Sequence, residues 1–296
     1  MDTDTPEAGA ARDDEGAVGT TFGPVGVVGA GAMGAGIAQV AATAGHRVTL
    51  VDLVDGAAVA AVEKVGSALT RLVEKGRLSQ DAASAALARI TPARSLDELP
   101  ECGLVIEAVP ENLAVKQGIF AELAERQPPT TVLATNTSSI DIDDIADDVA
   151  DPERVLGLHF FNPPPVMALV EVVHGKRTAQ AYVEHATALM EAWGKTPVRC
   201  SSTPGFIVNR VARPFYGEAQ RIVEAGIADP ATVDWILREK GGFPMGPLEL
   251  TDFIGQDVNL AVGSRGPIGK PPFSRSTQST VAASAMPLST IRCASP

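Results

Sequence analysis

Cysteine and basic residues are scarce in this chain, and each scarcity excludes a class of protein. The three cysteines, Cys102, Cys200 and Cys293, are widely spaced and form no C-x-x-C pair, so neither a disulfide framework nor a zinc site is indicated. With 24 Lys and Arg against 36 Asp and Glu, the net charge is −12, which argues against a nucleic acid or an anionic membrane as the main partner. We therefore predict a cytoplasmic protein without a metal, and its 296 residues leave room for two domains.

Charged residues are absent between Gly16 and Gly45, a length that raises the alternative of a membrane span. Gly and Ala interrupt this segment, and it lacks the Leu, Ile and Phe density of real spans. The acidic N-terminus also lacks the positive region of a secretory signal. We expect no membrane span, and we interpret residues 1–22, rich in Asp, Glu, Thr, Gly and Ala, as a disordered acidic leader.

A glycine-rich turn between a short apolar strand and a helix is the first strong motif. It reads G-x-G-x-x-G from Gly29 to Gly34, and a second apolar strand, 48–51, ends on Asp52. Gly29 makes the tight turn, Gly31 lets the backbone approach a pyrophosphate, and Gly34 lets the helix pack on the strand. The N-terminus of the helix then offers free N–H groups to the phosphates.

Asp52 gives this motif its cofactor preference. At the end of the second strand, its carboxylate can accept hydrogen bonds from both ribose hydroxyls and would repel a 2′-phosphate. A lone glycine motif is weak evidence, but here strand, turn, helix, strand and acid follow in the required order. The sequence therefore predicts NAD as the cofactor, in preference to NADP.

Further strands at 104–109 and 131–135, separated by a helix, continue an alternation of strands and helices. This order predicts a Rossmann-type, doubly wound α/β sheet whose ligands collect at the carboxyl ends of the strands. Glu111 and Ser138 both follow such ends. For Ser138, a role as a turn residue or helix N-cap is an equal alternative on position alone.

His159 and Glu171 are polar residues in apolar strands, at 155–158 and 169–173. A lone strand histidine is more often a satisfied core residue, but an isolated glutamate among Val and Leu is unusual, because buried charges require partners. The economical interpretation is that the two side chains bind each other. A carboxylate on one imidazole nitrogen fixes the tautomer, so that the other nitrogen can act as a general base on an alcohol.

Helical periodicity without strands follows Pro204, which predicts a separate all-helical domain. From Gly263 onward the pattern stops, and the composition becomes rich in Ser and Pro without Asp or Glu, so we interpret the end either as a disordered tail or as an out-of-frame or replaced C-terminus. The helical domain is then incomplete. The predicted organisation is a leader at 1–22, a nucleotide-binding domain at 23–202, a partial helical domain at 203–262 and a low-complexity tail at 263–296.

With these motifs in hand, the chain resembles the L-3-hydroxyacyl-CoA dehydrogenases from about Val25 to Val262. Details at 209–216 and 243–247 look most like the long bacterial 3-hydroxyadipyl-CoA dehydrogenases of phenylacetate catabolism. The matching stretches are 28–39 (VGAGAMGAGIAQ), 107–113 (EAVPENL), 136–139 (NTSS), 159–163 (HFFNP) and 204–210 (PGFIVNR).

The resemblance implies NAD-dependent oxidation of a 3-hydroxyacyl-CoA, in fatty-acid β-oxidation or in butanoate or phenylacetate catabolism, by a homodimer. It assigns His159 as the base, Glu171 as its partner, and Ser138 and Asn209 as the residues that hold the substrate oxygen. The chain departs from the family at Ala168, where Lys is usual. The predicted cofactor-binding residues are Gly29, Gly31, Ala32, Met33, Gly34, Asp52, Glu111 and Asn136.

Two alternatives stay open at this point. A dehydrogenase of free hydroxy acids also opens with G-x-G-x-M-G, but that family uses a lysine base and lacks the HFFNP stretch. The second alternative is an NAD-binding remnant without turnover, because the C-terminal sequence departs from the family after Val262. Activity on a CoA thioester, abolished by substitution of His159, would separate both from the main interpretation.

Overall fold

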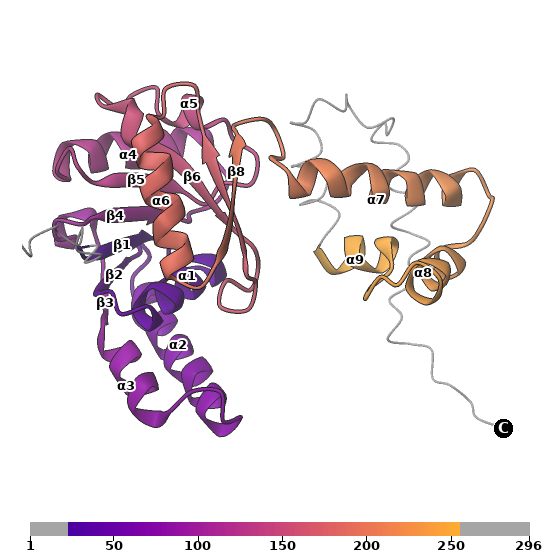
Figure 1. The fold of residues 1–296 in the computed structure, drawn as a ribbon, viewed down its shortest axis with the longest axis horizontal. Helices are drawn as coiled ribbons and strands as arrows, with labels where there is room; N and C mark the ends of the chain where they lie inside the picture. Colours follow the sequence, from indigo (N-terminus) through magenta and orange to yellow (C-terminus); the bar gives the residue numbers. More distant parts are fainter. Residues whose placement is uncertain (1–22, 255–296) are drawn as a thin grey trace, which may run out of the picture.

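In the computed structural model of the chain, residues 23–254 are described. The predicted leader at 1–22 and the predicted tail at 263–296 lie outside the described residues, as do residues 255–262 of the predicted helical domain. Figure 1 shows a large sheet with helices packed around it, and a smaller group of helices that the chain enters last. We call these parts the sheet domain (residues 23–201) and the helical lobe (residues 208–254).

One eight-stranded sheet organises the sheet domain, in the order β3-β2-β1-β4-β5-β6-β7-β8. Neighbouring strands are parallel except for β6 and β7, which pair antiparallel. The predicted doubly wound sheet is therefore confirmed: β1 to β6 run parallel, and β7 and β8 run in the opposite direction. The strands are β1 (Val25–Val28), β2 (Val48–Val51), β3 (Ile90–Ala93), β4 (Leu104–Glu107), β5 (Val132–Thr135), β6 (Val155–Phe160), β7 (Leu169–His174) and β8 (Thr196–Ser201).

Helices cover both faces of this sheet, because successive strand residues point to opposite sides. Leu104 and Ile106 of β4 belong to the core under α1, α2, α3 and α6, whereas Val105 belongs to the core under α4 and α5. The helices are α1 (Ala32–Thr43), α2 (Ala57–Glu74), α3 (Gln80–Ala88), α4 (Leu113–Arg126), α5 (Ile142–Ile145) and α6 (Gln180–Ala192), with 3₁₀ turns at Leu96–Glu98 and Pro152–Arg154.

The sequence predicted most of these elements but missed α3 and β3. In helix α2, the buried residues Ala61, Val65 and Leu69 recur at four-residue spacing. Strand β3 is four residues long and contains Pro92. A proline weakens any strand signal, and the sheet accepts it because β3 is the edge strand.

The helical lobe consists of α7 (Val208–Glu224), α8 (Pro230–Glu239) and α9 (Pro247–Ile254) within the described residues. Asp229 accepts a hydrogen bond from the Thr232 N–H at the start of α8 and so caps this helix. The Asp234 carboxylate accepts from two N–H groups at the start of α9, at 2.9 Å each. Capping bonds therefore fix how these short helices meet.

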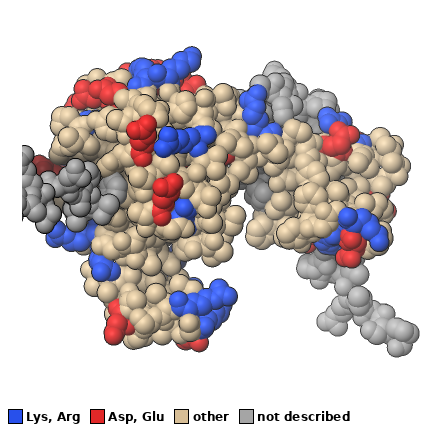
Figure 2. Space-filling view, in the orientation of Figure 1, with Lys and Arg blue, Asp and Glu red and all other residues tan. Residues whose placement is uncertain are grey.

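The surface carries charges of both signs. On the face shown in Figure 2, Lys and Arg side chains are interspersed with Asp and Glu over both parts of the molecule. Among residues 23–254, no helix combines the length and the apolar character that crossing a bilayer requires.

Candidate functional site

The site is organised around His159 on β6 and Glu171 on β7, which face each other in the antiparallel register. The imidazole Nδ1 lies 2.6 Å from Glu171 Oε2. His159 is 7% exposed and Glu171 is fully buried. Because an ionised carboxylate can only accept, the Nδ1 position carries the proton, and Nε2 is left as the nitrogen that can take one.

The second carboxylate oxygen of Glu171 has partners of its own. Oε1 accepts hydrogen bonds from the backbone N–H groups of Ile207, at 2.9 Å, and Val208, at 2.8 Å. Burial by itself raises the pKa of the Glu171 carboxyl. The bonds from His159 and from these N–H groups lower the pKa by more than burial raises it, so the pKa ends below its ordinary value. The carboxylate is therefore held in its charged form.

Two aromatic rings contact the imidazole. The ring centroid of Phe161 lies 4.6 Å from that of His159, and the ring of Phe206 lies 5.6 Å away in an edge contact. Phe206 is 2% exposed and has a φ of 47°, in the left-handed region that non-glycine residues rarely adopt. Its buried ring against His159 holds the backbone in this strained conformation.

Glu111 lies beside the carboxyl end of β5, where it organises the loop that contains Ser138. Its Oε1 accepts from the Thr137 hydroxyl at 2.5 Å, the Ser138 N–H at 3.2 Å and the Ser139 hydroxyl at 3.3 Å. The N-cap of α5 is Asp141, so the capping alternative for Ser138 is not what the fold uses. Ser138 is bound through its backbone, which leaves its hydroxyl available for a ligand.

A buried ion pair beneath this loop was missed by the sequence analysis. Lys116 Nζ lies 2.7 Å from Glu107 Oε1 and 3.5 Å from Glu111 Oε2, and the Thr135 hydroxyl donates to Glu107 Oε2 at 2.7 Å. Glu107 and Lys116 are both buried. The signal was a glutamate inside the apolar strand 104–109, which is the pattern that identified Glu171.

The two asparagines are placed by different elements. Asn136 follows β5, and its Oδ1 accepts from the Phe160 N–H at 2.9 Å, next to His159 in the chain. Asn209 is the second residue of α7 and is half-buried. The bond from the Val208 N–H to Glu171 ties the residue before Asn209 to the pair of His159 and Glu171.

The glycine turn has the geometry that the motif predicts. Gly29 has a φ of 102°, and a Cβ there would lie 2.7 Å from the Ala108 carbonyl oxygen. A Cβ on Gly34 would lie 1.7 Å from the Gly29 carbonyl oxygen, whereas one on Gly31 would meet nothing within 4 Å. Open space at Gly31, beside the uncapped N–H groups of Ala32 and Met33 at the start of α1, suits a phosphate.

Helix α1 also contacts the loop that follows His159. A Cβ on Gly36 would lie 2.8 Å from Cδ of Pro164. Lys195 Nζ holds the same loop by donating to the Pro164 carbonyl at 2.6 Å and the Met167 carbonyl at 2.9 Å. The helix of the glycine motif and the loop after the histidine are therefore in direct contact.

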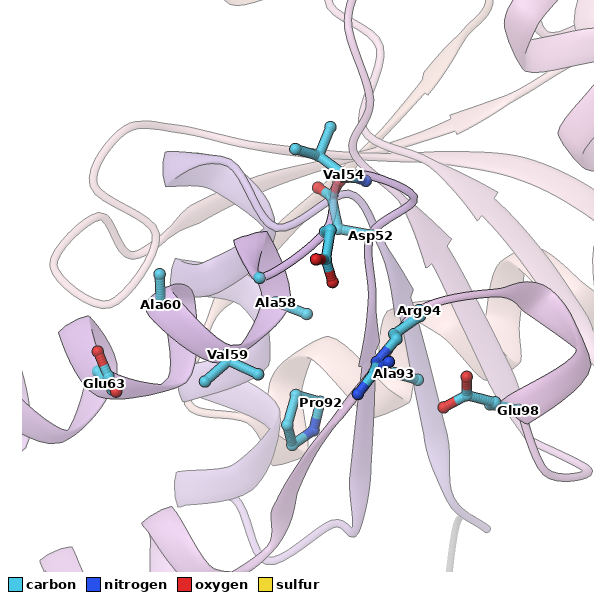
Figure 3. A pocket seen from close by; sticks show the side chains of 12 residues that line it. Asp52, Val54, Ala58, Val59, Ala60, Glu63, Pro92, Ala93, Arg94 and Glu98 are labelled. Atoms are coloured by element: carbon cyan, nitrogen blue, oxygen red, sulfur yellow. Dashed lines mark hydrogen bonds between the residues drawn. The ribbon is translucent and has the colours of Figure 1, made fainter.

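A cavity of about 540 Å³ adjoins Asp52, between the start of α2 and the end of β3. Figure 3 shows the Asp52 carboxylate beside it, with Val59, Pro92 and Arg94 around the space. Asp52 accepts from the Ala30 N–H at 2.7 Å and the Val54 N–H at 2.9 Å. The charged lining residues are Asp52, Asp55, Glu63, Arg94 and Glu98. Four acids against one base suit an uncharged adenosine better than one carrying a 2′-phosphate.

Comparisons with known proteins agree on one family. The model of the 3-hydroxyacyl-CoA dehydrogenase NAD-binding domain matches residues 24–203, and the model of the C-terminal domain matches residues 205–285. The 3-hydroxyadipyl-CoA dehydrogenase of Escherichia coli is 54% identical over 238 residues, which cover 80% of this chain and 50% of that protein. A probable 3-hydroxybutyryl-CoA dehydrogenase of Bacillus subtilis is 42% identical over 236 residues, covering 80% of this chain and 82% of that protein.

Solved structures give the same result. The crystal structure of FadB2 from M. tuberculosis has a TM-score of 0.82 and 40% identity, covering 88% of this chain and 94% of that one. A 3-hydroxybutyryl-CoA dehydrogenase structure from Escherichia coli K12 has a TM-score of 0.80 and 53% identity, covering 82% of this chain and 52% of that one. The chain thus spans about half the length of its Escherichia coli relatives.

Proposed function

The chain belongs to the 3-hydroxyacyl-CoA dehydrogenase family, and from that premise we propose that it catalyses the reversible, NAD-linked oxidation of an L-3-hydroxyacyl-CoA to the 3-ketoacyl-CoA. The single observation that carries the proposal is the buried bond between His159 and Glu171. An imidazole oriented in this way is what the removal of a proton from a substrate hydroxyl requires.

In this reaction His159 Nε2 accepts the proton of the 3-hydroxyl group in the oxidative direction and returns it in the reductive one. Glu171 keeps Nδ1 protonated and stabilises the imidazolium that forms. A general base of this kind contributes about 100-fold to 10,000-fold in rate.

Ser138 and Asn209 hold the substrate oxygen while its charge changes. Hydrogen-bond donors that are fixed before the reaction stabilise developing charge at little reorganisation cost. Three bonds from the loop to Glu111 support the position of Ser138, and the Val208 N–H bond to Glu171 supports that of Asn209.

NAD, when bound, supplies the acceptor for the substrate hydride. The N–H groups of the glycine turn, including those of Ala32 and Met33, would bind its phosphates, and Asp52 would accept from its ribose hydroxyls. Asn136 and Glu111 would contact the cofactor on the side of the loop next to His159. Preference for NAD over NADP follows from Asp52 and from the acidic lining of the adjoining cavity.

The substrate is a CoA thioester, which the names of the related dehydrogenases support. We include in the proposal a cytoplasmic location and assembly as a homodimer. Exposed apolar side chains of the helical lobe, such as Val211, Trp235 and Phe253, support the second point, because a partner copy would cover such residues.

The test is NADH oxidation by the purified protein with acetoacetyl-CoA, with a longer dicarboxylic 3-ketoacyl-CoA, and with free acetoacetate. Turnover is expected with the thioesters, and turnover with the free acid alone would favour a hydroxy-acid dehydrogenase. His159→Ala should lower kcat by about 100-fold to 10,000-fold and leave NADH affinity unchanged. His185→Ala, at an exposed position on α6, is the matched control. NADH binding without any turnover of the unsubstituted chain would contradict the proposal.

A further inference from the structure

Helix α7 begins in an unusual way, because its first N–H groups are satisfied by another part of the molecule. A helix leaves its first N–H groups without intrahelical partners, and a side chain at the N-cap commonly accepts from them. The N-cap of α7 is Ile207, which makes no side-chain capping bond. The acceptor is Glu171 Oε1, from β7, 36 and 37 residues earlier in the chain.

Glu171 therefore divides its two oxygens between two parts of the protein. Oε2 binds the imidazole of His159, and Oε1 binds the start of α7. A fully buried carboxylate is stable only when its charge is compensated by hydrogen bonds, and here the compensation comes from both sides. If either set of donors is removed, the other set alone must compensate the charge of the buried carboxylate.

The connection between the sheet domain and the helical lobe is short. Strand β8 ends at Ser201 and α7 begins at Val208, so six residues cross from one part to the other. Within this crossing, the buried ring of Phe206 packs on His159, and the next two N–H groups bind Glu171. In Figure 1, α7 leaves the sheet domain at this point and leads into α8 and α9.

We propose that Glu171 is a positioning residue for the helical lobe as well as for His159, so that one buried carboxylate sets the imidazole tautomer and the place of Asn209 together. The part that concerns Asn209 and the substrate oxygen rests on the proposed function, whereas the capping of α7 does not. Asn209 lies one residue beyond the bonded N–H of Val208, so loss of the cap displaces it first.

Substitution by glutamine separates the two roles. An amide has one oxygen, and the two N–H groups of Ile207 and Val208 both require an acceptor. The oxygen of Glu171→Gln is therefore expected to face α7, and its NH₂ group to face His159 Nδ1. A donor at that place forces Nδ1 to accept, which puts the imidazole proton on Nε2 and removes the base.

The experiment is amide hydrogen exchange at Ile207 and Val208, resolved by NMR in the full chain, for three variants. Glu171→Ala should raise exchange at both amides about tenfold or more, because charge-assisted bonds are lost. His159→Ala, which leaves Oε1 in place, should leave both amides protected. Glu171→Gln should also keep them protected, while the ¹⁵N shifts of His159 change to those of the Nε2–H tautomer.

Two results would overturn the proposal. One is unchanged exchange at both amides in Glu171→Ala. If that variant does not fold, Glu171→Gln decides, since an unchanged His159 tautomer would place the amide oxygen toward His159, and amides of Ile207 and Val208 that stayed protected without it would show that the cap is incidental. None of these measurements needs turnover, so a failure of the proposed function, seen as no NADH oxidation by the unsubstituted chain, is distinguishable from a failure of this proposal.

Discussion

The sheet domain and the helical lobe differ in how their positions are fixed. In the sheet domain, strands β1, β2, β4, β5 and β6 are buried along their whole length between two layers of helices. In the described part of the lobe, Ala219 and Val233 are buried, whereas Val211, Ile227 and Phe253 are more than two-thirds exposed, at 71%, 75% and 79%. The sheet domain therefore places its residues through its own core, and the lobe depends more on contacts such as that of Glu171 with α7.

The difference teaches how the candidate site is divided. His159, Glu171 and Ser138 stand on or beside strands and inherit the rigidity of the sheet, whereas Asn209 stands on the first turn of α7. The two tryptophans of the chain report on the two parts separately, because Trp193 is buried in the sheet domain and Trp235 is 51% exposed in the lobe. Variants with Trp193→Phe or Trp235→Phe make each part visible by fluorescence.

The largest effect is expected from breaking the buried ion pair of the sheet domain. Lys116→Met leaves Glu107 buried without its cation, which should cost about 3–5 kcal/mol of unfolding free energy. Urea unfolding followed through Trp193 measures the loss. Lys64→Met, at an exposed position on α2, is the control and should change the free energy by less than about 0.5 kcal/mol. Equal effects of the two substitutions would refute the assigned role of Lys116.

The next largest effect is expected where α1 meets the loop after His159. Gly36→Ala puts a methyl group 2.8 Å from the rigid ring of Pro164, so we expect a loss of about 1–3 kcal/mol from overpacking and a lower kcat. Thermal unfolding and steady-state kinetics measure both. The control is Gly118→Ala, in an exposed helical position of α4 where a Cβ meets nothing within 4 Å.

Gly118→Ala and its counterpart Gly217→Ala in α7 sharpen the comparison further. A Cβ on Gly217 also meets nothing within 4 Å, and alanine in a helix is favoured over glycine by about 0.5–1 kcal/mol. We expect Gly118→Ala to raise the midpoint of the unfolding transition that Trp193 reports. We expect Gly217→Ala to raise the midpoint of the transition that Trp235 reports. If each variant raised both transitions equally, the two parts would be a single cooperative unit, and the contrast drawn between them would fail.

The smallest effect is expected on mild acidification. The folded pKa of Glu171 lies below its ordinary value of 4.5, so its charge stabilises the protein above that value, and the contribution is lost as the pH falls through the folded pKa. Between pH 7 and pH 5 only the beginning of this loss of stability is measurable. The unfolding free energy should fall slightly more for the unsubstituted chain than for Glu171→Gln. Glu224→Gln, an exposed carboxyl of α7, should behave like the unsubstituted chain, and a Glu171→Gln curve that fell in parallel would count against the linkage.

Much of the fold was predictable because the relevant physics acts over short stretches of sequence. The glycine turn and Asp52 identified β1, α1 and β2. Helix α3 and strand β3 were missed, because the helix is rich in alanine with little apolar contrast and the strand contains Pro92. Their places are set by packing against neighbours that the local sequence does not reveal.

The site was predictable where a charge interrupts an apolar run. Glu171 was identified in this way, and Glu107 shows the same signal, whereas its partner Lys116 lies on a helix where lysine is ordinary. The bonds that Glu171 accepts from Ile207 and Val208 had no signal in the sequence, because backbone N–H groups are the same for nearly every residue type.

That uniformity bears on protein engineering. A lobe taken from another protein needs no particular side chains at positions 207 and 208 to dock on this sheet, since every residue except proline brings the N–H group that Glu171 accepts. A chimera joined after Phe206 should therefore keep these two bonds with any residues other than proline at positions 207 and 208. Glu171, on the sheet side, therefore offers an attachment point that does not depend on the side chains of the lobe.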